Sequence, residues 1–210
     1  GGAYVVFGGH ELADTISLGS LGTGGFRIIG ARAGDQAGIS VSLIDDMNGD
    51  GRAEIAIGAP AYDVSGVTNA GGVFIVFGKA NATEVDLSQI ALGTGGFLIR
   101  GGALEDALGY SVASAGDVNG DGRGDIVLGA TLANATSFDS GAAYVVFGKA
   151  TGGTVNVASM GAQGFIISGA SANDQLGFAV SGIGDVNGDG KADVAIGTRL
   201  SDLNGTDSGS

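Results

Sequence analysis

The sequence has 210 residues, with 22 acidic and 9 basic side chains, a formal net charge of −13 and no cysteine. This acidic balance argues against nucleic acid as a partner, because phosphate binding needs a basic patch, and the lack of cysteine excludes disulfides and thiolate metal sites. Hydrophobic residues make up 44% of the chain, which excludes an acidic disordered polymer. No apolar run reaches the ~18 residues of a membrane span.

Short β-like segments follow one another along the chain, rich in Val, Ile, Phe and Tyr and bounded by Gly, Asp, Asn and Ser. The first two are residues 3–8 and 25–30. The middle of the chain carries a set of four, and the C-terminal region carries two more within 178–197. The middle set comprises residues 109–115, 125–130, 142–148 and 164–169.

These segments recur with a fixed period. GGAYVVFGG begins at residue 1, GGVFIVFGK at 71 and GAAYVVFGK at 141, so the period is 70 residues. Self-similarity at such a period indicates a repeat architecture, and four short strands per repeat describe one blade of a β-propeller. We predict an all-β fold of three ~70-residue repeats built as four-stranded antiparallel blades. A stacked β-solenoid is the alternative, although its repeats are usually shorter.

The strand order predicts four units. Residues 1–34 form an outer half-blade of two strands, 35–105 a blade, 106–173 a blade, and 174–210 an inner half-blade with a cation loop. The two ends therefore complement each other as halves of one blade. Three blades are too few to close a ring, so the chain is expected to be a fragment of a larger propeller or half of a six-bladed ring. In the second case a homodimer forms by half-blade exchange, and the sequence leaves both open.

Each repeat contains a loop of the form Asp-x-Asn-Gly-Asp-Gly-x-x-Asp/Glu. Positions 1, 3, 5 and 9 offer side-chain oxygens, position 7 offers its backbone carbonyl, and Gly at position 6 permits the sharp turn. Oxygen ligands at this spacing suit Ca²⁺, one ion per repeat. The predicted metal ligands are Asp46, Asn48, Asp50, Arg52 and Glu54; Asp117, Asn119, Asp121, Arg123 and Asp125; and Asp185, Asn187, Asp189, Lys191 and Asp193. Arg52, Arg123 and Lys191 act through their backbone carbonyls.

Two alternatives compete with this interpretation. An EF-hand needs a bidentate Glu at position 12 and flanking helices, whereas Ile57, Leu128 and Ile196 stand there and the flanks are strands. A metal-free Asx turn is also possible for a single loop. Three copies at matching positions, each with three carboxylates in nine residues, favour a cation with a structural role.

Together these residues resemble the FG-GAP repeats of the integrin α N-terminal β-propeller, in the form found in bacterial extracellular proteins. LGYSVA and LGFAVS match the first element of the repeat, the Asp/Asn-rich loop follows, and Gly58-Ala59-Pro60 matches the last element. The resemblance implies a calcium-stabilised propeller, usually of seven blades, that serves adhesion or ligand binding. It implies an extracellular or cell-surface location.

The resemblance also indicates which face would bind a protein or polysaccharide ligand, namely the one opposite the cation loops. Candidate contacts there are Tyr62, Asp63, Asn134, Phe138, Asp139, Asp202 and Asn204. A rigid structural or self-assembling repeat unit of a large surface protein is an alternative function. A propeller hydrolase or lyase is another, but no nucleophilic triad or phosphate loop is present, so we expect no enzyme. Arg123-Gly124-Asp125 spells an integrin-recognition tripeptide, yet Asp125 is expected to face the cation.

Overall fold

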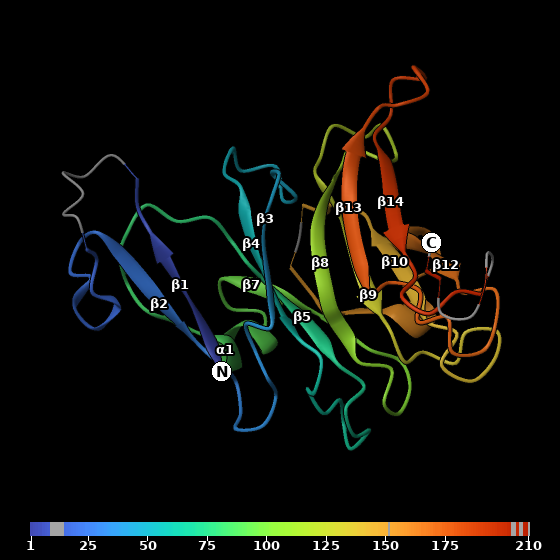
Figure 1. The fold of residues 1–210 in the computed structure, drawn as a ribbon. Coiled ribbons are helices and arrows are strands. Elements are labelled where there is room, and N and C mark those ends of the chain that lie inside the picture. The colour runs from blue at the N-terminus through green and yellow to red at the C-terminus, as the bar shows by residue number, and fades with distance from the viewer. Residues whose placement is uncertain (9–14, 151, 203–204, 206–207, 210) are drawn as a thin grey trace.

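The computed structural model describes residues 1–8, 15–150, 152–202, 205 and 208–209, and these form an all-β molecule (Figure 1). Its longer strands are β1 (Gly2–Val6), β2 (Gly25–Ile29), β3 (Ser40–Ile44), β4 (Glu54–Ala59), β5 (Gly72–Val76), β7 (Gly96–Arg100), β8 (Leu108–Gly116), β9 (Asp125–Ala130), β10 (Ala142–Val146), β12 (Gly164–Ser168), β13 (Ala179–Gly184) and β14 (Asp193–Gly197). The short elements are β6 (Val85–Asp86), β11 (Val155–Asn156), helix α1 (Leu87–Ala91) and the 3-10 turns η1 (Leu18–Ser20), η2 (Val157–Ser159) and η3 (Gly161–Gln163).

Two complete four-stranded units form the middle of the molecule. The strands β3, β4, β5 and β7 pair antiparallel in chain order, and so do β8, β9, β10 and β12. Each unit is therefore one antiparallel meander, the arrangement of a propeller blade. This confirms the predicted all-β blade architecture.

A two-stranded unit lies on each side of these blades. The strands β1 and β2 pair antiparallel near the N-terminus, and β13 and β14 pair near the C-terminus. Figure 1 places the two pairs at opposite ends of the array. Short parallel pairings link neighbouring units, because β6 adds to the outer edge of β2 and β11 adds to the outer edge of β7.

Burial on both faces explains the near-continuous apolar runs of the central strands. All residues of β5, β9 and β10 are buried. One cluster of buried side chains joins the two blades, a second joins β1–β2 to the first blade, and a third joins the second blade to β13–β14. The hydrophobic core is thus a series of layers between successive sheets.

Glycine sets the close spacing between the inner strands. A Cβ atom on Gly58 would lie 2.1 Å from the Gly109 carbonyl oxygen, and one on Gly129 would lie 1.9 Å from the Gly177 carbonyl oxygen. Serine hydroxyls bridge the same junctions, since Ser40 Oγ donates to Gly109 O at 2.8 Å and Ser111 Oγ donates to Gly177 O at 2.7 Å. Successive blades therefore contact each other through backbone.

Candidate cation loops and ligand face

Each predicted cation loop connects the first and second strands of its unit. Residues 46–54 lie between β3 and β4, residues 117–125 between β8 and β9, and residues 185–193 between β13 and β14. We call these segments loops 1, 2 and 3. The last residue of each is the first residue of the following strand, which fixes the position-9 carboxylate to the sheet.

In loop 1 the carboxylate and amide oxygens accept hydrogen bonds from the loop's own backbone. The Asp46 carboxylate accepts from the N–H groups of Gly49 at 2.6 Å, Asp50 at 3.1 Å and Gly51 at 2.7 Å. Asn48 Oδ1 accepts from Asp50 N–H at 2.8 Å, and Asp50 Oδ1 accepts from Arg52 N–H at 2.9 Å. These bonds fold the loop around its polar side chains.

Loops 2 and 3 repeat the same bonds. The Asp117 carboxylate accepts from Gly120 N–H at 2.7 Å and Gly122 N–H at 2.8 Å, and Asp185 accepts from the equivalent glycines at 2.7 and 2.9 Å. The glycines at positions 4 and 6 have φ between 79° and 85° in all three loops, a region that favours glycine. One backbone conformation is therefore built three times.

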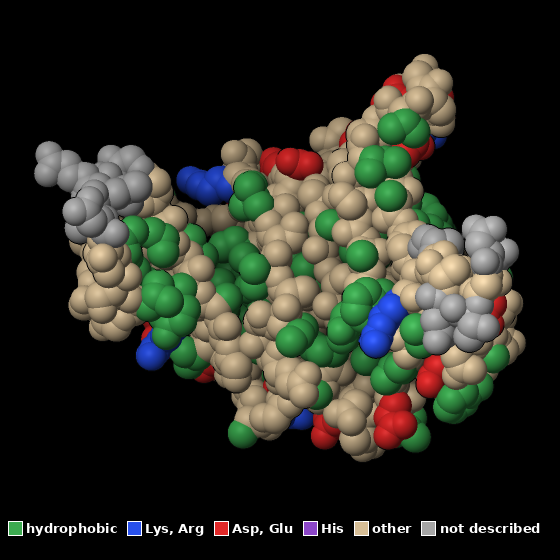
Figure 2. All heavy atoms as spheres, viewed as in Figure 1, with side chains coloured by type: hydrophobic (Ala, Val, Ile, Leu, Met, Phe, Trp, Pro, Cys, Tyr) green, Lys and Arg blue, Asp and Glu red, His purple; other side chains and the backbone are tan. Residues whose placement is uncertain are grey.

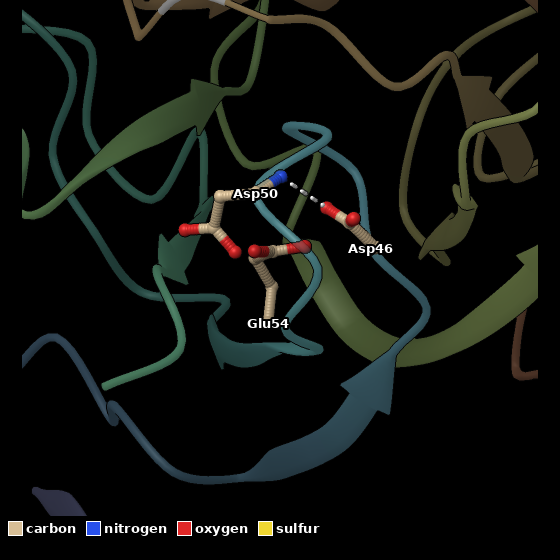
Figure 3. Close-up of side chains that lie close together, drawn as sticks. All are labelled: Asp46, Asp50 and Glu54. Atoms are coloured by element: carbon tan, nitrogen blue, oxygen red, sulfur yellow. Dashed lines mark hydrogen bonds between the residues drawn. The ribbon is translucent and has the colours of Figure 1, made fainter. Parts of the chain in front are cut away.

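The position-9 carboxylate of loop 1 is buried, and only one of its two oxygens accepts a hydrogen bond of normal geometry from the described residues. Glu54 is 0% exposed, and its Oε2 accepts from Met47 N–H at 2.6 Å. Among the described residues, Oε1 has no hydrogen-bond partner of normal geometry. The carboxylate oxygens of Asp46, Asp50 and Glu54 come within 4.8 Å of one another, and Figure 3 shows the three side chains converging.

Burial and neighbouring charge both act on these carboxylates. Burial, together with the negative charges of Asp46 and Asp50, raises the pKa of Glu54 to about 7. Backbone hydrogen bonds, led by that of Gly51, lower the pKa of Asp46. Hydrogen bonds led by that of Gly190 likewise lower the pKa of Asp185. Asp46, Asp50 and Glu54 thus share one small space, and a cation placed among them would stabilise all three negative charges.

In loop 2 the position-9 side chain is Asp125, also 0% exposed. Its Oδ2 accepts from Val118 N–H at 2.9 Å and its Oδ1 from Gly148 N–H at 2.8 Å, while burial raises its pKa. Within the described residues, loop 1 alone brings three carboxylates within 4.8 Å of one another. Aspartate is one methylene shorter than glutamate, so its carboxylate stays closer to the strand. Burial of Asp125 also withdraws the Arg-Gly-Asp tripeptide from contact with a receptor.

The donor set fits a hard cation. It contains only oxygen, and Glu54 Oε1 is a buried acceptor without a hydrogen-bond partner of normal geometry in the part of the chain that the structure describes, so a cation would satisfy it. At position 7 the side chains reach the preceding loop, since Arg123 Nη1 donates to Asn48 O at 3.4 Å and Lys191 Cε lies 3.5 Å from a Cβ built on Gly120. The metal role of the Arg52, Arg123 and Lys191 carbonyls stays a prediction.

The structure places the predicted ligand contacts in different environments. Tyr62 is 7% exposed, and its ring packs edge-on against Phe74 at 5.3 Å, which leaves little surface for a ligand. Asp63 and Asn134 accept backbone hydrogen bonds within their turns. Phe138 is 68% exposed and Asp202 is exposed, whereas Asp139 is half-buried. Asn204 lies outside the described residues.

A hollow of about 480 Å³ lies at the crossovers between units, and none of the predicted contacts that the structure describes lines it. We call it the crossover hollow; its polar and aromatic lining residues are Gln36, Asn69, Glu105, Tyr110, Thr131, Gln175, Phe178 and Arg199. The rings of Tyr110 and Phe178 lie 5.2 Å apart, and Arg199 Cζ lies 5.2 Å from the Phe178 ring centre. The hollow lies on the face that we predict to bind a ligand, opposite the cation loops, because the turns that follow β4, β9 and β14 line it. Its aromatic residues Tyr110 and Phe178, in LGY and LGF, were predicted as strand residues and not as ligand contacts.

Of the described residues, none belongs to a helix long and apolar enough to cross a membrane. Comparison with known proteins gives similarity to integrin alpha-PS2 of Drosophila melanogaster, 30% identical over 84% of this chain and 12% of that protein. Integrin alpha pat-2 of Caenorhabditis elegans is 29% identical over 80% of this chain and 14% of its own length. Phosphatidylinositol-glycan-specific phospholipase D of Bos taurus is 29% identical over 78% of this chain and 19% of its own length.

The chain therefore spans less than a fifth of each of these relatives. The model of the FG-GAP repeat matches residues 37–76, 108–146 and 177–210. These ranges contain the three loops together with strands β3 to β5, β8 to β10, and β13 and β14. This match covers more than half of the sequence and agrees with the blade architecture. The chain belongs to the FG-GAP repeat family.

Proposed function

We propose that this chain is a calcium-stabilised propeller module that binds a protein or polysaccharide ligand outside the cell. The observation that carries the calcium part is Glu54, a fully buried carboxylate whose Oε1 has no hydrogen-bond partner of normal geometry within the described residues. Two further carboxylates approach it. A buried charge in this state is costly unless a counter-ion pairs with it.

Calcium suits these loops better than other common metals. Ca²⁺ takes six to eight oxygen ligands at about 2.3–2.6 Å in flexible geometry, Mg²⁺ keeps more water, and Zn²⁺ prefers nitrogen or sulfur. In loop 1 the ligands would be Asp46, Asn48, Asp50, the Arg52 carbonyl and Glu54. Each ion would fasten the turn of one hairpin, so its role is structural.

The crossover hollow is the place we propose for ligand recognition. Half-exposed aromatic rings, one carboxylate and one guanidinium group line it, with three side-chain amides from two repeats. Aromatic faces bordered by such polar groups suit sugar rings or protein side chains. Similarity to integrin alpha chains supports an extracellular or cell-surface setting and an adhesive role.

Binding of the chain to a glycan array and to a panel of extracellular-matrix proteins, measured in millimolar calcium and again in EDTA, would test this proposal. The variants Tyr110→Ala and Arg199→Ala should lose ligand binding while keeping the parent melting temperature. Leu92→Ala, at a side chain that is 79% exposed and does not line the hollow, is the matched control. Binding that is unchanged in both hollow variants would refute the hollow as the ligand site.

An enzyme is the second candidate, and the phospholipase relative is what favours it. Acid–base hydrolysis usually uses a pair of carboxylates or a histidine. The described lining of the crossover hollow holds one carboxylate, Glu105, and the loop carboxylates already accept backbone hydrogen bonds. We therefore propose a non-catalytic module. Turnover of a phosphodiester or glycoside that Glu105→Gln abolishes would contradict this.

A further inference from the structure

The three cation loops are hydrogen-bonded to one another in series along the array. Figure 1 shows them at the same end of the sheets, each at the turn that follows the first strand of its unit. Gly124 N–H of loop 2 donates to Asp46 O of loop 1 at 3.0 Å, and Ala192 N–H of loop 3 donates to Asp117 O of loop 2 at 3.0 Å. Position 8 of one loop thus bonds to position 1 of the preceding loop at both junctions.

Each of these junction bonds joins backbone that carries predicted cation ligands of both loops. In loop 2, Gly124 lies between the predicted ligand carbonyl of Arg123 and the predicted ligand carboxylate of Asp125. Its partner Asp46 supplies the first ligand of loop 1, and the Asp46 carboxylate accepts from three N–H groups that shape that loop. A cation that fixes residues 123–125 would therefore also fix Asp46. Both loops lie on the polar surface of the molecule, where Figure 2 shows acidic side chains along this end.

Side chains of the second blade add two contacts at the junction between loops 1 and 2. Arg123 Nη1 donates to Asn48 O at 3.4 Å, so position 7 of loop 2 reaches position 3 of loop 1. Ser114 Oγ donates to Asp45 Oδ2 at 3.0 Å, immediately before loop 1. The second blade therefore holds loop 1 along residues 45–48, which include its first two predicted ligands.

The residue before each loop packs against position 8 of the next loop, and glycine occupies one member of each pair. At the first junction the glycine is Gly124, since a Cβ built there would lie 2.5 Å from Asp45 O and 2.7 Å from Asp45 Cβ. At the second junction the glycine is Gly116, with φ 72°, and a Cβ built there would lie 2.7 Å from Ala192 Cβ. This packing explains why loop 2 has glycine at position 8, where loops 1 and 3 have alanine.

We infer that the loops bind cations as a coupled series, in which a cation in one loop raises the affinity of the adjacent loop through the bonds from position 8 to position 1. Such coupling rests on the calcium role proposed above. The first ion bears the conformational entropy cost of ordering the shared backbone, so the next ion binds to a segment that is already ordered. Positive cooperativity between adjacent loops follows.

Electrostatics between the loops acts in the opposite direction. Each loop carries three carboxylates, and a calcium ion bound in loop 2 would cancel negative charge that attracts an ion to loop 1. This effect falls as the ionic strength rises, because salt screens exposed charges. Coupling through the backbone therefore predicts that filling loop 2 tightens binding in loop 1, whereas charge alone predicts that it weakens binding there.

Calcium titration of this chain, with one loop weakened at a time, measures the coupling. The amide resonances of the position-6 glycines, Gly51, Gly122 and Gly190, report each loop separately. Asp121→Asn removes a charged ligand from loop 2 and should weaken calcium binding at loop 1 by about 5-fold or more. Asp50→Asn should weaken binding at loop 2 by a similar factor, because coupling between two sites is reciprocal. Loops that respond only to their own substitution, or a neighbouring loop that binds more tightly, would overturn the coupling alone. A parent chain that binds no calcium would refute the calcium role and the coupling together.

The packed pair provides a second test that leaves every predicted ligand in place. Gly124→Ala should reduce the coupling between loops 1 and 2, because its Cβ meets Asp45, while the coupling between loops 2 and 3 stays as in the parent. Adding Asp45→Gly recreates the pair of Gly116 and Ala192 and should restore the coupling. Asp45→Gly alone, which loses the bond from Ser114, is the control. In EDTA the double variant should melt above Gly124→Ala, a readout that needs no calcium. Parent-like coupling in Gly124→Ala, or a double variant no better than Gly124→Ala, would refute this junction as the route of the coupling.

Discussion

Glu54→Gln is the substitution that separates a cation ligand from a purely structural carboxylate. Glutamine keeps the volume of Glu54 and an oxygen that can accept from Met47 N–H, but it removes the charge. In EDTA the variant should unfold at or above the temperature of the parent, because a buried charge repelled by Asp46 and Asp50 is gone. In calcium the order should reverse, because the loop 1 site has lost a ligand.

The size of the reversal follows from binding linkage. A cation at 100 times its dissociation constant stabilises the folded state by about 2.7 kcal/mol per site. For a chain of this length 1 kcal/mol corresponds to about 2–4 °C, so losing one site should lower the melting temperature in calcium by about 5–10 °C. Scanning calorimetry with calcium and with EDTA measures both values.

The control carries the same chemical change away from the loops. Glu84 pairs with Arg27 on the surface, and both side chains are about half exposed, so Glu84→Gln should shift the melting temperature little and equally in both conditions. If Glu54→Gln lowered the melting temperature by the same amount with calcium and with EDTA, Glu54 would be only a hydrogen-bond acceptor. The reasoning from its lone oxygen would then be refuted.

Substitutions at two further positions test the close backbone contact between blades and a buried hydrogen bond in a crossover turn. In denaturant titration Gly129→Ala should lower the free energy of unfolding by about 1–3 kcal/mol or more, because the new Cβ would lie 1.9 Å from Gly177 O. The control Gly19→Ala, at an open surface position, should change it little. Equal stability of the two variants would contradict the close backbone contact. Asp106 is buried and accepts from Ala103 N–H at 2.9 Å, so Asp106→Ala should cost about 1–3 kcal/mol and Asp106→Asn, which keeps an acceptor, should cost less. An alanine variant as stable as the asparagine variant would count against that hydrogen bond.

Local sequence signals predict the loops and strands well. The alternation of acidic, amide and glycine residues in 46–54, 117–125 and 185–193 places each turn correctly, because glycine at positions 4 and 6 supplies the positive φ that the turn requires. The period of 70 residues predicts the repeated strands, and the family match agrees. The burial of Glu54 and the lack of a hydrogen-bond partner of normal geometry for its Oε1 among the described residues do not follow from the pattern, since both depend on how the next strand packs.

Features that depend on contacts between units could not be predicted from the sequence. The crossover hollow joins Tyr110, Phe178 and Arg199 from two repeats, and its existence depends on the spacing of neighbouring blades. Tyr62 was expected on the ligand face, but the structure packs its ring against Phe74. Helix α1 was not expected either; its five residues form because Asp86 caps them, accepting from Ser88 N–H at 2.8 Å. The parallel pairings of β6 with β2 and of β11 with β7 were not predicted either, because each joins a short segment to a strand of the neighbouring unit.

The central claim is that the three loops bind calcium, and counting bound ions tests it most directly. Equilibrium dialysis or native mass spectrometry of the calcium-loaded chain should give three Ca²⁺ per chain, one for each of residues 46–54, 117–125 and 185–193. An excess of Mg²⁺ should displace little of it, because six to eight oxygen ligands favour the larger ion. No calcium retained at millimolar concentration would contradict the account.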